Sequence, residues 1–117
     1  MKGWPKIDGA VADYVDGNWL RDSPLKRRLR EETAKMPGAG MQISAHQGQQ
    51  IGLLAHAIGA RRAVEVGTFT GYSALSIVEG LPADGKLWCC DVSEQWTRIA
   101  RRYWKEDRKS TRLNSSH

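Results

Sequence analysis

The run VEVGTFTGYSAL at residues 64–75, followed by KLWCCD at residues 86–91, decides the fold. The first run opens as a short apolar, β-branched segment that breaks at Gly67, a pattern typical of a buried parallel strand. Gly67 and Gly71 bracket the next turn, where the missing side chains let the backbone bend sharply and approach a ligand closely. The second run ends on Asp91, twenty residues after Gly71. We therefore predict the strand, helix and strand of a nucleotide-binding α/β unit.

The details of this unit favour one adenosine ligand over another. Asp91 can accept hydrogen bonds from two ribose hydroxyls, and the helix that starts near Gly71 points free amides at the same place. The turn has G-x-x-x-G, whereas a dinucleotide cradle needs G-x-G-x-x-G. Glu65 would repel a diphosphate but attract an ammonium group. These features favour S-adenosylmethionine, with an NAD-binding or other nucleotide-binding Rossmann module as the alternative and a purely structural turn as the plainest interpretation.

These residues resemble the cation-dependent class I O-methyltransferases, the family of the caffeoyl-CoA and catechol enzymes. The resemblance runs from about Met41 to Trp104, and its most specific block is residues 65–73. The matching segments are MQIS at 41–44, GQ at 48–49, IGA at 58–60, residues 65–75, LP at 81–82, DGK at 84–86 and Asp91. The resemblance implies an α/β fold of the Rossmann-like methyltransferase type, preceded by N-terminal helices.

The family pattern also implies which residues contact S-adenosylmethionine. It places Ile43 against the cofactor, Glu65 near its methionine amine, Gly67 and Thr68 under it, Ser73 on its carboxylate side and Asp91 on its ribose. In the family, a divalent cation such as Mg²⁺ makes a substrate hydroxyl more acidic, and that hydroxyl attacks the sulfonium methyl group. The resemblance therefore implies methyl transfer to a small aromatic, catechol-like or CoA-linked acceptor. Because the family's metal ligands lie on later strands, we expect the cation only in a full-length protein and assign no metal or catalytic residue.

The chain divides into three expected segments. Residues 1–40 form an N-terminal helical segment, residues 41–106 the first half of the cofactor-binding domain, and residues 107–117 a non-native tail. Only two strands can be placed before residue 107, so we expect a fold truncated after the second strand and inactive on its own. The tail is polar, has no apolar stripe and looks like translated vector sequence, although a natural disordered tail has the same composition.

Charge does not indicate a nucleic-acid partner. The formal net charge is +5, but Arg108, Lys109 and Arg112 of the tail supply three positive charges, which leaves +2 without them. The basic cluster at residues 26–30 is followed by two glutamates, so we interpret it as a solvated helix face. Its use as a contact for substrate phosphates is a second possibility, to which we assign no site.

Local signals place the helices and exclude other site types. The serines expected to cap helices are Ser23, which precedes a proline, Ser44 and Ser93. Cys89 and Cys90 are adjacent in an expected strand and are interpreted as core, and the histidines form no recognisable ligand motif. No apolar run approaches the roughly 20 residues of a membrane span, and no signal peptide is recognised. We therefore expect a cytoplasmic protein with no membrane partner and a homodimer when full length.

Overall fold

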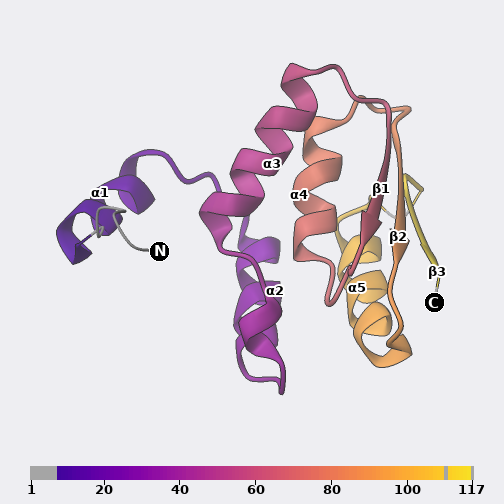
Figure 1. Ribbon diagram of the computed structural model, residues 1–117, viewed down its shortest axis with the longest axis horizontal. Coiled ribbons are helices and arrows are strands. Elements are labelled where there is room, and N and C mark those ends of the chain that lie inside the picture. The colour runs from indigo at the N-terminus through magenta and orange to yellow at the C-terminus, as the bar shows by residue number, and fades with distance from the viewer. Residues whose placement is uncertain (1–7, 110, 117) are drawn as a thin grey trace, which may run out of the picture.

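The computed structural model describes residues 8–109 and 111–116, which form a parallel sheet with helices gathered on one side of it (Figure 1). The strands are β1 (Arg62–Val66), β2 (Lys86–Cys90) and β3 (Leu113–Ser116), in the order β1-β2-β3. Both pairs are parallel, with Val64 opposite Trp88 and Leu87 opposite Leu113. The predicted α/β architecture and its first two strands are confirmed.

The expectation of a sheet that ends after the second strand is wrong, because β3 forms within the segment we expected to be a non-native tail. Its sequence LNSS is mostly polar, so no apolar alternation marks it as a strand. The pairing places Leu113 beside Leu87, and both side chains are buried. The buried position of Leu113 and the hydrogen-bonding edge of β2 account for this strand. The tail's non-native origin stays a prediction, and residues 1–7, 110 and 117 of the expected segments lie outside the described residues.

Helices pack against only one face of the sheet. Helices α4 (Tyr72–Gly80) and α5 (Glu94–Glu106) follow β1 and β2 respectively and enclose a core that includes Leu75, Leu87 and Trp104. Burial alternates along β2, with Leu87 and Cys89 buried and Trp88 exposed. In Figure 1 the opposite face of the sheet carries no helix of the described chain.

The N-terminal half adds further helices, two of which pack against α4. It comprises α1 (Gly9–Asn18), α2 (Pro24–Ala34), the 3-10 turn η1 (Ala39–Met41) and α3 (Ala45–Ala57). Side-chain oxygens of Ser23, Ser44 and Ser93 accept hydrogen bonds from the first turns of α2, α3 and α5, as predicted. Within the described residues, no helix has the length and apolar character needed to cross a membrane.

Small residues let α3 and α4 approach closely. A Cβ atom on Gly48 would lie 2.7 Å from the Ser76 hydroxyl oxygen, and one on Gly52 would lie 2.5 Å from the Ser76 carbonyl oxygen. Both distances are shorter than real Cβ contacts. Glycine therefore suits this face of α3, because α4 side chains occupy the space of a side chain at Gly48 and the α4 backbone occupies it at Gly52.

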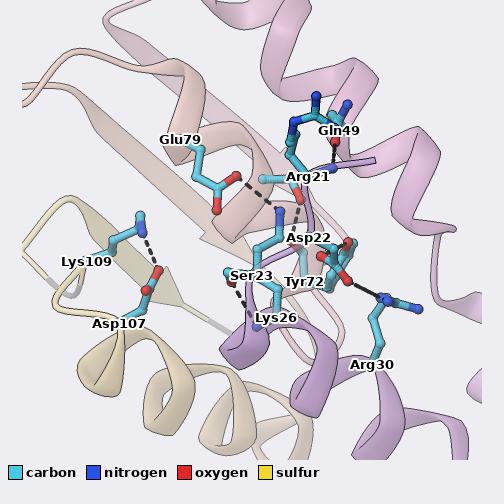
Figure 2. Close-up of polar contacts among 11 residues, drawn as sticks. Arg21, Asp22, Ser23, Lys26, Arg30, Gln49, Tyr72, Glu79, Asp107 and Lys109 are labelled. Atoms are coloured by element: carbon cyan, nitrogen blue, oxygen red, sulfur yellow. Dashed lines mark hydrogen bonds and ion pairs between the residues drawn. The ribbon is translucent and has the colours of Figure 1, made fainter. Parts of the chain in front are cut away.

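The prediction of a solvated basic face on α2 is wrong for Lys26. Its side chain is buried, with the residue only 2 % exposed. The ammonium lies 3.2 Å from a Glu79 carboxylate oxygen and 4.9 Å from the centre of the Tyr72 ring. Figure 2 shows this pairing between α2 and α4. A charge run in the sequence does not reveal that one lysine turns inward, because the partner Glu79 is 53 residues away.

Candidate functional site

The loop between β1 and α4 has an unusual backbone. Gly67, Phe69 and Gly71 all have positive φ, at 87°, 51° and 92°. Glycine adopts this region readily, but a non-glycine residue such as Phe69 occupies it at a cost. The Gly67 amide donates to the Cys90 carbonyl at 2.8 Å, which ties the start of the loop to the end of β2. The loop is therefore a specific, tightly turned structure at the carboxyl ends of two parallel strands.

The loop delivers the chain into the start of α4. Gly71 is the N-cap residue of this helix and offers no side-chain cap to the first turn. Amides at a helix N-terminus carry partial positive charge and bind anionic groups such as a carboxylate. The sequence predicted a helix that starts near Gly71, and the structure confirms this start.

Glu65 lies beside that helix start. The Ser73 hydroxyl donates to Glu65 Oε2 at 2.5 Å, so β1 and α4 meet through two predicted site residues. Glu65 Oε1 and Thr68 Oγ1 are both buried, and neither makes a well-formed hydrogen bond among the described residues, although the nearby Thr68 hydroxyl lowers the pKa of the Glu65 carboxyl. A buried acceptor without a well-formed hydrogen bond is costly, and a ligand that supplies an ammonium group would satisfy it.

Burial also changes the acidity of Glu65. Loss of water raises the pKa of its carboxyl above the ordinary value, and the hydrogen bond from Ser73 opposes that rise. A raised pKa in the folded state means that the folded chain binds a proton more tightly than the unfolded chain does. Protonation of Glu65 therefore stabilises the folded state of the chain when no ligand is bound.

We expect the free energy of unfolding of the unliganded chain to fall as pH rises through the raised folded pKa of Glu65. Above that pH the folded state must keep a buried charge that the unfolded state can hydrate. Urea denaturation from pH 4 to pH 8 of the wild type and of Glu65→Gln checks this. The variant should gain stability over the wild type as pH rises, and a difference that does not change with pH would contradict the assignment.

Asp91 closes the other side of the loop. Its Oδ2 accepts the Phe69 amide at 2.7 Å and its Oδ1 accepts the Ser93 amide at 3.1 Å. Each carboxylate oxygen can accept more than one hydrogen bond, so a ribose hydroxyl can still be bound. Asp91 thus holds the loop in shape, a role that the sequence prediction did not include.

The wall opposite the loop comes from the last residue of η1 and the two residues after it. Residues 41–43 and the loop surround a small cavity of about 50 Å³, whose lining includes Ile43, Gly67, Thr68 and Ser73. Four of the six predicted residues therefore share one cavity. Glu65 adjoins it through its hydrogen bond to Ser73, and Asp91 adjoins it through the Phe69 amide. This volume is well below the roughly 300–1,000 Å³ that ligand cavities commonly enclose, so this cavity alone does not hold a whole cofactor.

Sequence reasoning missed two parts of this site. Phe69 packs edge-to-face on Trp96, with ring centres 4.9 Å apart and planes at 90°. Trp96 lies in the first turn of α5, five residues after Asp91, and this position already indicates in the sequence an aromatic on the adenine side, but the sequence does not reveal its contact with Phe69. Thr70 was also missed, because its partner Thr33 lies 37 residues earlier in the chain.

Among the described residues, neither Cys89 nor a metal-ligating cluster forms a second reactive site. Burial raises the pKa of the Cys89 thiol to about 12, so this cysteine stays protonated and is a poor nucleophile. In the described ranges 8–109 and 111–116, no group of three or more His, Cys, Asp and Glu side chains could hold a metal ion. A larger cavity of about 320 Å³ between α2, α3 and α4 contains none of the six predicted residues.

Comparison with known proteins then identifies the family. The family described as O-methyltransferase matches residues 18–116, which is most of the chain. The chain belongs to the O-methyltransferase family. This O-methyltransferase chain is 33 % identical over 102 residues to the catechol O-methyltransferase domain-containing protein 1 of Mus musculus, covering 87 % of the chain and 39 % of that relative. It is 40 % identical over 75 residues to caffeoyl-CoA O-methyltransferase 2 of Petunia hybrida, covering 64 % and 31 %.

Solved structures agree with this membership. An O-methyltransferase from Bacillus cereus, solved in complex with SAH, superposes with a TM-score of 0.83 at 27 % identity and covers 92 % of this chain and 49 % of its own. The Rossmann-like class I methyltransferase fold is thereby confirmed for this O-methyltransferase chain. The chain spans about a third of the length of the two curated relatives and about half of the Bacillus cereus protein.

Proposed function

We propose that the chain binds S-adenosylmethionine in the β1–α4 site and is the cofactor-binding part of a hydroxyl methyltransferase. The observation that carries this proposal is the buried Glu65 Oε1, which makes no well-formed hydrogen bond in the described chain. The ammonium of the methionine moiety would satisfy that oxygen, while its carboxylate would meet Ser73 and the first amides of α4. Ile43, Gly67 and Thr68 would enclose the methionine end, and Asp91 would accept ribose hydroxyls.

The acceptor that we propose is a hydroxyl on a small aromatic, catechol-like or CoA-linked molecule. The named activities of the similar proteins, a caffeoyl-CoA O-methyltransferase and a catechol O-methyltransferase domain-containing protein, support this class. A divalent cation, when bound in a longer chain, would lower the pKa of that hydroxyl. We propose that the 117-residue chain alone is inactive, since it spans only part of its relatives. The homodimer, the cytoplasmic location and the absence of a nucleic-acid partner stay predictions.

An NAD-binding or other nucleotide-binding module is the second candidate. The βα loop at the end of a parallel strand and the acid at the end of the next strand suit either ligand. The position of Glu65 favours S-adenosylmethionine, because a buried carboxylate that repels a diphosphate is well matched to an ammonium group. The two candidates therefore make opposite predictions for a change at Glu65.

Calorimetric titration with S-adenosylhomocysteine, which keeps the ammonium and carboxylate groups, tests the proposal. We expect Glu65→Gln to weaken binding by about 1.5–3 kcal/mol, or roughly 10- to 150-fold in Kd, the range for hydrogen bonds to charged groups. Glu31→Gln, the same change at an exposed glutamate of α2, should leave Kd unchanged. Preferential binding of NAD to the wild type, strengthened by Glu65→Gln, would establish the second candidate instead.

A further inference from the structure

The site loop is held from its β2–α5 side by the contacts of Asp91 and by two aromatic side chains. Phe69 rests on Trp96, and the Trp104 indole N–H lies 3.3 Å from the Gly71 carbonyl oxygen. Positive φ at Phe69 is a strained backbone conformation for a non-glycine residue, so surrounding contacts must hold it. These contacts fix only one side of the loop.

Helix α2 supplies the other side through a buried pair of threonines. The hydroxyl oxygens of Thr33 and Thr70 lie 2.7 Å apart, and both side chains are buried. The Thr33 hydroxyl also lies 2.8 Å from the Leu29 carbonyl, to which it donates its single proton. Thr70 is therefore the donor to Thr33, and loss of the Thr33 hydroxyl would leave a buried donor unsatisfied.

A second contact joins the segment before α2 to the first residue of α4. The Tyr72 hydroxyl donates to Asp22 Oδ1 at 2.8 Å, while Arg30 donates to Asp22 Oδ2 from Nε at 2.9 Å and from Nη2 at 2.5 Å. The Asp22 side chain is 3 % exposed, so this charge is compensated by Arg30 in a nearly dry place. Lys26, paired with Glu79, supports the Tyr72 ring from the same helix (Figure 2).

The acidity of Tyr72 suits this arrangement. Burial raises the pKa of its hydroxyl, and the hydrogen bond to Asp22 raises it further. The hydroxyl therefore keeps its proton and stays a donor at neutral pH. Tyr72 directly precedes Ser73, so a shift of Tyr72 also moves the hydroxyl that pairs with Glu65.

We propose that α2 and the segment just before it are a built-in support for the cofactor loop, with Thr33 and Asp22 as positioning residues that act through Thr70 and Tyr72. The two contacts hold the loop in its binding conformation before the ligand arrives. Ligand affinity falls in proportion when fewer molecules hold a competent conformation. The expected effect on ligand affinity rests on the proposed function. The expected effect on the order of the loop does not.

Thr33→Val tests this in the full 117-residue chain. It removes one buried hydroxyl and keeps the branched shape, so we expect roughly 3- to 10-fold weaker binding of S-adenosylhomocysteine by calorimetry, as for one lost hydrogen bond. We also expect faster amide hydrogen exchange in residues 67–73, with exchange in α3 unchanged. Thr33→Ser restores the hydroxyl and should recover both values. Asp22→Asn, which removes the charge that Arg30 pairs with, provides a second variant should Thr33→Val fail to fold.

The matched control is Glu32→Gln on the same helix. Glu32 accepts from the Tyr103 hydroxyl at 2.8 Å and pairs with Arg102, so it ties α2 to α5 and not to the loop. The Glu32→Gln variant should keep its affinity for S-adenosylhomocysteine and the amide exchange rates of residues 67–73 within twofold of the wild type. Equal effects of Glu32→Gln and Thr33→Val, or wild-type loop exchange in a folded Thr33→Val, would overturn the support role. If the wild type bound no S-adenosylhomocysteine, the proposed function would fail, and the exchange comparison would still decide this inference.

Discussion

Replacing Gly71 by alanine is expected to destabilise the chain by about 2–5 kcal/mol, much of the total stability of a small domain. The φ of 92° costs an L-residue about 1–2 kcal/mol. The new Cβ would also lie 2.7 Å from both the Ala100 Cβ and the Trp104 indole nitrogen, and such overpacking costs about 1–3 kcal/mol. Urea denaturation followed by circular dichroism would measure the loss.

Gly67→Ala is the matched control for this change. Gly67 has a similar φ of 87°, but a Cβ there would meet nothing within 4 Å. Only the backbone cost of about 1–2 kcal/mol should appear. Equal losses at the two positions would show that α5 does not pack against Gly71 as described, and that conformation alone explains the requirement for glycine.

Gly80→Ala is expected to have the second-largest effect, a loss of about 3 kcal/mol at the upper end of overpacking. Its Cβ would fall on the Gly52 carbonyl oxygen and lie 3.2 Å from the Ala55 Cβ. A backbone oxygen cannot rotate away, so α3 as a whole must move from α4. Thermal unfolding of the variant would show the loss, together with a reduced urea midpoint.

Gly17→Ala in α1 provides the comparison for Gly80. No atom lies within 4 Å of a Cβ at Gly17, and the residue is exposed within a helix. Alanine there should stabilise the helix by about 0.5–1 kcal/mol through its better propensity. A neutral result at Gly80 would mean that α3 and α4 are not in backbone contact.

Much of the fold was predictable because its signals are local. The helix starts at Ser23, Ser44 and Ser93 depend on residues three positions away, and the β1–α4 turn depends on glycines four positions apart. The cavity beside the loop contains Ile43, Gly67, Thr68 and Ser73, four of the six residues that the family resemblance places at the cofactor, and their contact with a cofactor stays a prediction. Short-range chemistry and a specific motif were sufficient for these features.

The features that were missed depend on pairings between distant segments. Strand β3 forms because Leu113 finds a buried place beside Leu87, which polar neighbours conceal in the sequence. Lys26 is buried because Glu79 and Tyr72 of another helix surround its ammonium. Thr33 gave no signal at all, since a threonine within a helix has no pattern that names its partner.

Because one face of the sheet is uncovered, apolar strand residues on that face should tolerate polar substitutions that residues on the covered face do not. Val64 and Val66 of β1 are 68 % and 85 % exposed, whereas Leu87 and Cys89 on the covered side of the neighbouring strand are buried. In a library of single replacements of this chain, threonine or lysine at Val66 would remove no buried contact and would relieve an apolar surface that favours association. The same replacements at Leu87 would open the core, so the two faces of one short sheet would differ sharply in the residues they accept.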